Sequence, residues 1–376
     1  MKSVKRNILL NPGPATTTDS VKLAQVVPDI CPREASFGRL MESVSEDLAA
    51  LAGDPSYYTT VLFSGSGTAA VESILSSVID QEAVVIINNG AYGKRMCEIA
   101  QTYRLNAVEF ASPYDEAIDL SALETMIQCS PHNISHLAVV HHETTVGLLN
   151  DIQAIGDLCR RYRIDMIVDA MSSFGAIPIE MEQMNISYMA ASSNKNLQGM
   201  AGIAFVIANK RKLNRLKNKR PRNYYLDLYA QYQYFAETLQ MRFTPPVQTF
   251  YALKQAIEEL KREGVEARYA RYARSWKTLI QGISRLGLKH LVEERHHSKL
   301  VTSILEPHCS GYDFREMHDF FYSNGFTIYP GKLEKTNTFR IANIGDITYQ
   351  DIEAFLALLE HYLKGIQYLH RKADSI

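Results

Sequence analysis

Short apolar segments alternate with longer helix-like segments over the first two-thirds of the chain, and this alternation limits the possible folds more than any other feature. The apolar segments are near-continuous, as at residues 83–87 and 136–140. Strands that are apolar on both faces are typical of a parallel sheet with helices on both sides. Further strands are expected at 59–63, 105–110, 164–168 and 202–207, and helices at 68–78, 93–103 and 151–162. The sequence therefore predicts an α/β fold with a mostly parallel sheet.

The last third of the chain has a different character. A long helical region over 248–286 is interrupted near Gly264, and a final helix is expected over 348–368. Strand-like segments at 300–305 and 339–341 lie between these helical regions. We therefore predict a large domain over residues 1–250 and a smaller C-terminal α+β domain over 251–376.

The charge balance excludes several classes of partner. The 376 residues include 40 Lys or Arg and 41 Asp or Glu, so the formal net charge is −1. Such a chain has no overall attraction for nucleic acid or for an anionic membrane surface. A hydrophobic fraction of 46% also provides for a sizeable core, unlike the composition of a disordered protein. We predict neither a nucleic-acid partner nor a membrane partner.

The cysteines and the N-terminus indicate the cellular compartment. Five cysteines at widely spaced positions form no CxxC pair, which is typical of reduced thiols in a cytoplasmic protein. The N-terminal apolar run covers only residues 8–10, too short for a secretory signal, and the longest apolar run is far shorter than a membrane span. The sequence predicts a cytoplasmic protein.

Three charged or titratable clusters have ordinary explanations. The histidines near Glu143 lack the HExxH spacing of a zinc site, so no metal site is predicted. The basic residues of 209–222 are expected on a solvated helix. Arginines and aromatic residues alternate over 268–276, but the alanines there repeat at helical spacing, which favours a packed amphipathic helix over a nucleic-acid site.

A candidate phosphate site lies where the strand at 59–63 leads into the helix at 68–78. Gly65 and Gly67 allow the backbone to approach a ligand closely, and Ser66 and Thr68 provide hydroxyl groups. The start of the helix adds free N–H groups and the positive end of its dipole. The segment is neither GxGxxG nor GxxxxGK[ST], and an N-capped turn without a ligand explains these residues equally well.

Two further residues give the phosphate site a chemical context. Asp169 ends an apolar strand, where active sites of open α/β sheets gather, and Lys195 lies in a loop of small polar residues. Each residue alone also fits a turn former or a surface charge. A phosphate cradle, a strand-end carboxylate and a loop lysine together meet the needs of pyridoxal 5′-phosphate: an anion site, a partner for the pyridine nitrogen and an amine for a Schiff base.

Over nearly its whole length the chain resembles the class V aminotransferases of the type I pyridoxal-phosphate fold. The matching segments are 10–14, 64–68, 89–95, 142–147, 168–175, 193–195 and 339–345. Within the class it is most similar to the 2-aminoethylphosphonate–pyruvate transaminases, through residues 29–34, 171–178 and 242–246. The resemblance implies transfer of the amino group of 2-aminoethylphosphonate to pyruvate by a ping-pong mechanism. An alanine–glyoxylate or serine–pyruvate aminotransferase and a non-catalytic protein on the same scaffold remain the alternatives.

The resemblance also assigns cofactor residues. Lys195 is implied as the Schiff-base lysine and proton carrier, and Asp169 as the partner of the pyridinium nitrogen. The residues implied to hold the 5′-phosphate are Ser66, Gly67 and Thr68, with help from Asn194. The residues implied around the ring are Tyr92 on one face, Met171 near the other and Thr145 at the phenolic oxygen. Tyr92 also argues against a cysteine desulfurase, because those enzymes stack a histidine on the cofactor.

Three assignments concern the substrate and a second subunit. Arg340 is implied to bind the carboxylate of the keto acid, for which its planar guanidinium is suited. Arg33 is a candidate for the phosphonate or the mouth of the site, with an ordinary ion pair as the alternative. Thr244 is implied to reach the phosphate of the other subunit's cofactor, so the resemblance implies a homodimer with shared sites. Some members of the family have a tyrosine three residues earlier, where this chain has Met241.

Overall fold

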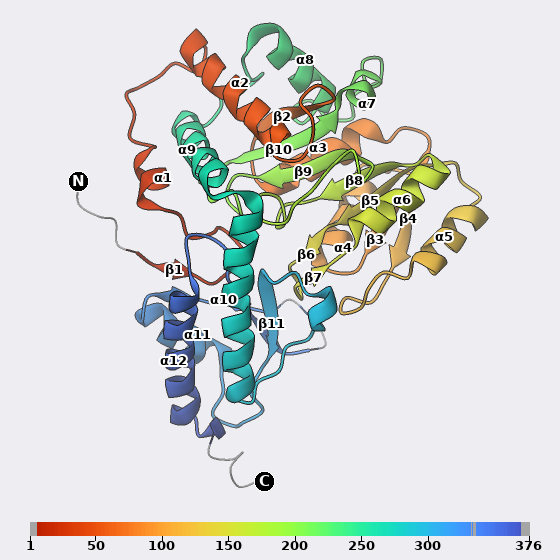
Figure 1. The fold of residues 1–376 in the computed structure, drawn as a ribbon. Coiled ribbons are helices and arrows are strands. Elements are labelled where there is room, and N and C mark those ends of the chain that lie inside the picture. The colour runs from red at the N-terminus through yellow and green to blue at the C-terminus, as the bar shows by residue number, and fades with distance from the viewer. Residues whose placement is uncertain (1–5, 332, 334–335, 370–376) are drawn as a thin grey trace.

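The structure is a computed structural model that describes residues 6–331, 333 and 336–369. A seven-stranded sheet forms its centre, in the order β2-β10-β9-β8-β5-β3-β4 (Figure 1). The strands are β2 (Tyr58–Ser64), β3 (Ala83–Asn88), β4 (Ala107–Ala111), β5 (Ile134–Val140), β8 (Asp165–Asp169), β9 (Ile186–Ser192) and β10 (Ile203–Asn209). All pairs are parallel except those of β10, which is antiparallel to β2 and β9. The predicted α/β fold with a mostly parallel sheet is confirmed.

One strand of this sheet was not expected from the sequence. Strand β9 is buried along its whole length between β8 and β10. Its second half is Ala190, Ala191 and Ser192, residue types with little intrinsic strand preference. Burial between two neighbouring strands therefore decides its conformation.

Helices cover both faces of the sheet (Figure 1). They are α2 (Ala35–Ala50), α3 (Gly67–Val78), α4 (Ala91–Thr102), α5 (Leu120–Cys129), α6 (Ile152–Tyr162), α8 (Leu228–Thr238) and α9 (Val247–Glu263). Strand β3 shows how the two cores arise: Val85 and Ile87 pack on the side of α2, α6 and α9, and Val84 and Ile86 pack on the side of α3 and α4. Because both faces of the strand are buried, its sequence is continuously apolar.

The C-terminal part forms a separate layer around a third core. It contains α10 (Val265–Arg285), α11 (Phe314–Ser323), α12 (Tyr349–Gly365) and a small sheet of order β11-β14-β13. The strands of that sheet are β11 (Val301–Leu305), β13 (Tyr329–Pro330) and β14 (Thr338–Ala342). The expected interruption near Gly264 is present, since α9 ends at Glu263 and Gly264 has a φ of +84°.

The chain crosses between the two layers more than once. The N-terminal strand β1 (Ile8–Leu9) pairs with β12 (Phe326–Thr327) in the C-terminal layer. Helix α9 extends from Val247 past residue 250, but its apolar residues belong to the core of the large sheet throughout. A division at residue 250 stays a prediction.

The structure shows the arrangement of two of the charged clusters. In the segment 209–222 only α7 (Lys210–Asn214) is helical, so the helix is shorter than expected. In α10, Arg268 is almost fully buried and binds Glu263 and the carbonyl of Asn196. That helix is packed, as expected, but its buried face contains Arg268, Tyr272 and Trp276, while Ala267 and Ala270 are exposed. Within the described ranges we find no helix long and apolar enough to span a membrane.

Candidate active site

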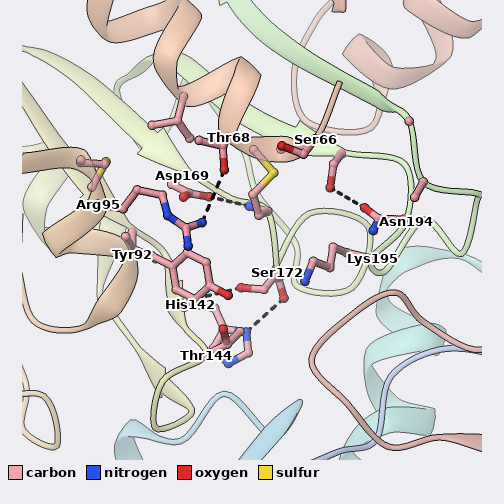
Figure 2. Close-up of a pocket in the computed structure, with 18 residues that line it drawn as sticks. Ser66, Thr68, Tyr92, Arg95, His142, Thr144, Asp169, Ser172, Asn194 and Lys195 are labelled. Carbon is pink, nitrogen blue, oxygen red and sulfur yellow. Dashed lines mark hydrogen bonds between the residues drawn. The ribbon is translucent and has the colours of Figure 1, made fainter. Parts of the chain in front are cut away.

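A cavity of about 320 Å³ lies at the carboxyl ends of β2, β5, β8 and β9 (Figure 2). Parallel strands place the residues that follow them at one edge of the sheet, which is where ligands bind in open α/β folds. Eight of the residues expected at the cofactor line the cavity: Ser66, Gly67, Thr68, Tyr92, Asp169, Met171, Asn194 and Lys195. The fold therefore brings together residues that are up to 129 positions apart in the sequence, from Ser66 to Lys195.

The N-terminus of α3 forms one end of the cavity. Ser66 is the N-cap residue of this helix, but its side chain makes no capping hydrogen bond, so its hydroxyl group can bind a ligand. A Cβ atom on Gly67 would lie 2.4 Å from Met171 Sδ, so glycine leaves the room that Met171 occupies. The first turn of a helix carries N–H groups without intrahelical partners and a positive dipole end. This end of the cavity is suited to a phosphate group.

Asp169 is buried at the end of β8, and its carboxylate accepts a hydrogen bond from Met171 N at 2.9 Å. Burial raises the pKa of this carboxyl group to about 6, although the Met171 N–H group opposes the rise. Nearby Glu143 raises the pKa further, and Arg95 and Lys195 lower it. A buried carboxylate with this pKa gains from a cationic partner, such as a protonated ring nitrogen.

Lys195 reaches the cavity from the loop after β9. Its Nζ donates to the carbonyl of Pro12 at 2.7 Å, so the N-terminal segment lies directly against it. Gly13 has a φ of +137°, and a Cβ atom there would lie 2.3 Å from Lys195 Nζ. This contact explains the glycine of the segment 10–14: only a residue without a side chain lets the backbone pass so close to the amine.

Glu143 fixes the position of Tyr92. Its buried carboxylate accepts hydrogen bonds from Tyr92 N at 3.0 Å and from Gly93 N at 3.4 Å, in the first turn of α4. A carboxylate at a helix N-terminus satisfies free N–H groups and interacts favourably with the dipole. The start of α4, and with it the ring of Tyr92, is thereby held at the cavity.

Thr144, rather than Thr145, lies on the cavity wall. Thr145 is buried on the other side of the chain, where its hydroxyl donates to Glu143 Oε1 at 2.6 Å and accepts from Ala91 N at 3.0 Å. His142 and Thr144 face the cavity, and Glu143 and Thr145 face α4. Residues 144–147 form a turn, and this turn places Thr144 on the cavity wall but not Thr145, the residue expected at the phenolic oxygen.

Besides Thr144, four polar residues that line the cavity were not expected there from the sequence: Arg95, His142, Ser172 and Ser192. His142 donates from Nδ1 to the carbonyl of Ser172 at 3.0 Å, so its other ring nitrogen carries the lone pair. Burial lowers the pKa of His142 to about 4, and the ring is neutral. Arg95 and His142 lie inside segments that match the family, which is the signal that could have found them.

Arg340 is buried beside the cavity without lining it. Its Nε donates to the carbonyl of Pro330 at 2.9 Å and its Nη1 donates to the carbonyl of Thr144 at 3.1 Å. Burial lowers the pKa of the guanidinium. Its hydrogen-bond acceptors in the described part of the chain are neutral carbonyl groups. An anionic ligand would therefore be a favourable partner for this buried cation.

Arg33 and Thr244 lie outside this cavity. Arg33 is exposed and donates to Gln240 Oε1 at 2.9 Å and to the carbonyl of Met241 at 2.8 Å. Thr244 is exposed on the same segment, before α9. Arg33 therefore anchors the segment that carries Thr244. Among the described residues it does not form the ordinary ion pair that was the alternative.

The histidines are engaged in hydrogen bonds rather than gathered around a common centre. His141 contacts Ser173 Oγ through Nδ1 at 2.9 Å, and His136 contacts Ser135 Oγ at 2.6 Å. Across the described residues, the structure contains no group of three or more His, Cys, Asp or Glu side chains arranged to hold a metal ion.

Comparisons with known proteins agree with this arrangement. The chain matches the family model for aminotransferase class-V over residues 22–322. It is 40% identical over 362 residues to the 2-aminoethylphosphonate–pyruvate transaminase of Klebsiella pneumoniae, covering 94% of this chain and 97% of that protein. A bifunctional phosphonoacetaldehyde hydrolase/aminoethylphosphonate transaminase of Clostridioides difficile is 39% identical, covering 95% of this chain and 56% of its own. The alanine–glyoxylate aminotransferase structure from a Nostoc species shares the fold, with a TM-score of 0.88 at 24% identity and 96% coverage of both chains.

Proposed function

The chain belongs to the class V aminotransferases, and we propose that it transfers the amino group of 2-aminoethylphosphonate to pyruvate, giving phosphonoacetaldehyde and L-alanine. The observation that carries this proposal is the likeness, over nearly the whole chain, to relatives named for these two substrates. The cavity supports it, because Lys195 and Asp169 both line it. The retention of both residues also argues against a non-catalytic protein on the same scaffold.

The cavity residues fit pyridoxal 5′-phosphate, the cofactor of this family. When bound, this cofactor supplies an electron sink and a carbonyl carbon that takes up amines. Ser66, Gly67 and Thr68 would hold the phosphate at the start of α3, with Asn194 beside them. Asp169 would pair with the ring nitrogen, and its burial fits a cationic partner.

The remaining cavity residues would fix the ring. Tyr92 and Met171 would contact its faces, and both line the cavity. Thr144 replaces Thr145 as the residue assigned to the phenolic oxygen, since its neighbour is bonded to Glu143. Lys195 Nζ would take the proton from the amine-bearing carbon of the donor and return it on the cofactor side. For the first of these transfers the amine must be unprotonated.

The reaction has two halves that use one site in turn, which makes the proposed mechanism ping-pong. In the first half the phosphonate donor would transfer its amino group to the enzyme, and in the second half pyruvate would receive that amino group. Arg340 would hold the carboxylate of pyruvate, because a buried guanidinium bonded to two carbonyls gains from an anion. The amine-bearing carbon of 2-aminoethylphosphonate carries no carboxylate, so this arginine would serve the second half.

A panel of amino donors tests the substrate assignment. In a single turnover without keto acid, 2-aminoethylphosphonate should bleach the visible absorbance of the bound cofactor at least about 100-fold faster than serine or alanine, because only a fitting donor is oriented for proton transfer. Addition of pyruvate should restore the absorbance and release alanine. Faster bleaching by serine or alanine would replace the proposal with the alanine–glyoxylate or serine–pyruvate alternative.

Replacement of Arg340 separates the two halves of the reaction. We expect Arg340→Gln to raise the KM for pyruvate roughly 30- to 100-fold, because the variant loses a charge-assisted hydrogen bond between the guanidinium and the carboxylate. Bleaching by 2-aminoethylphosphonate should change much less. Arg340→Lys, which keeps the charge but loses the fork, should fall between Arg340→Gln and wild type. An equal loss in both halves would show that Arg340 does not act on the carboxylate alone.

The proposed active form is a homodimer that shares its sites. Thr244 is exposed next to a cluster of aromatic side chains, in which Tyr225 stacks on Phe243 at 4.7 Å and Tyr224 is 77% exposed. Exposed apolar clusters of this kind mark interaction surfaces. Light scattering should give twice the chain mass.

We also propose a cytoplasmic location, which the five free thiols support. Cell fractionation tests this location.

A further inference from the structure

Arg95 lies on the cavity wall and contacts Thr68 and Tyr92, two other residues of that wall (Figure 2). Its Nη1 is 3.4 Å from Thr68 Oγ1, and its Cζ is 4.9 Å from the centre of the Tyr92 ring. Figure 2 shows its guanidinium between Thr68 and Tyr92, on the side of Asp169. In the described part of the chain, Arg95 forms no ion pair with a carboxylate at salt-bridge distance.

The contact with Thr68 sets the direction of its hydroxyl hydrogen. A guanidinium can only donate hydrogen bonds, so Thr68 Oγ1 accepts from Arg95. The hydroxyl hydrogen of Thr68 is then left to donate elsewhere, and Thr68 lines the cavity. An anion at the start of α3 requires donors, so this arrangement prepares Thr68 for a phosphate.

Arg95 also bears on the charge of Asp169. The titratable groups that act on this carboxylate are Glu143 from β6 (His142–Glu143), Arg95 from α4 and Lys195 from the loop after β9. Glu143 favours the protonated carboxyl, and the two cations favour the carboxylate. Lys195 is the reacting amine of the proposed function, whereas Arg95 has no part in the chemistry. Arg95 is therefore the permanent cation available to Asp169.

We propose that Arg95 is a positioning residue that prepares both ends of the cofactor site, by keeping Asp169 charged and by orienting the hydroxyl of Thr68. This inference rests on the proposed cofactor site. It does not depend on which amino donor the enzyme uses. Arg95 acts through Asp169 and Thr68 and is assigned no contact with substrate.

The test measures binding of pyridoxal 5′-phosphate to full-length protein freed of cofactor, between pH 5.5 and 8.5. Wild-type affinity should fall as the pH drops through about 6, where Asp169 gains its proton. In Arg95→Met the carboxylate loses a cationic neighbour, so the inflection should move up by about one pH unit. The titration alone should then lower affinity roughly twofold at pH 7 and roughly eightfold at pH 5.5. Arg95→Lys should keep the wild-type inflection because it keeps the charge.

A second ligand separates the two parts of the proposal. Pyridoxal, which lacks the phosphate, should show the same shift of inflection in Arg95→Met but a smaller loss of affinity at high pH. Lys94→Met removes a cation from an exposed position of the same helix and should match wild type throughout. A loss in Arg95→Met that is equal at every pH and equal in Arg95→Lys would show a purely structural role. Unchanged binding would also overturn the proposal, while a failed donor panel would leave it standing.

Discussion

Lys195→Ala should lose transaminase turnover by roughly 10³-fold or more, since no other group can replace a reacting amine. Lys195 is the one residue of the cavity whose nitrogen would both attach the cofactor and carry the proton. The measurement is alanine formation from 2-aminoethylphosphonate and pyruvate. Lys217→Ala, at an exposed position after α7, should retain wild-type turnover. Turnover of Lys195→Ala near wild type would refute the mechanism.

The same variant tests whether the site is shared between subunits. Thr244→Ala should weaken the cofactor site of the partner chain and lower activity. When Lys195→Ala and Thr244→Ala chains are co-expressed with different tags, one site of each mixed dimer carries both changes and the other carries neither. Purified mixed dimers should therefore regain roughly half of wild-type activity. Mixed dimers with no more activity than the average of the two parent proteins would contradict a shared site.

Asp169→Asn should reduce turnover by roughly 10²-fold or more and at the same time stabilise the cofactor-free protein at neutral pH. The loss of turnover follows because a neutral amide cannot hold the ring nitrogen in its protonated form. The change in stability follows from burial, which raises the pKa of Asp169 from 3.8 to about 6. The folded protein thus binds this proton more tightly than the unfolded chain does.

The stability linked to this proton is fully present below about pH 4 and is lost as the pH rises through about 6. About two pKa units correspond to roughly 3 kcal/mol. Asparagine does not ionise, so unfolding of cofactor-free Asp169→Asn should show a gain of up to that size at pH 8 and little gain at pH 4.5.

A matched variant on the same strand controls for the loss of a carboxylate. Asp165 lies at the other end of β8, where it forms an ion pair with Lys212 away from the cavity. Asp165→Asn should leave turnover unchanged. If Asp169→Asn and wild type had parallel stability from pH 4.5 to 8, the burial argument would be wrong.

The sequence by itself determined the class of fold, and its resemblance to a known family singled out eight of the residues that line the cavity. Short continuous apolar runs such as 83–87, separated by longer helix-like segments, are typical of strands buried on both faces, so the mostly parallel sheet could be predicted without coordinates. The site residues follow strand ends, and parallel strands bring those ends to one edge. Ser66, Asp169 and Lys195 therefore share a cavity, as predicted.

Only the tertiary structure decided which side chains face that cavity. Thr144 and Thr145 are the same residue type in adjacent positions, and the choice between them depends on the bonds that Glu143 makes with α4. The role of Gly13 depends on a contact with Lys195, 182 positions away. The position of Arg95 between Thr68 and Tyr92 likewise depends on how α3 and α4 pack. Local sequence sets the elements and their order, but contacts between distant segments set orientation, because side-chain direction depends on neighbours that the local pattern does not contain.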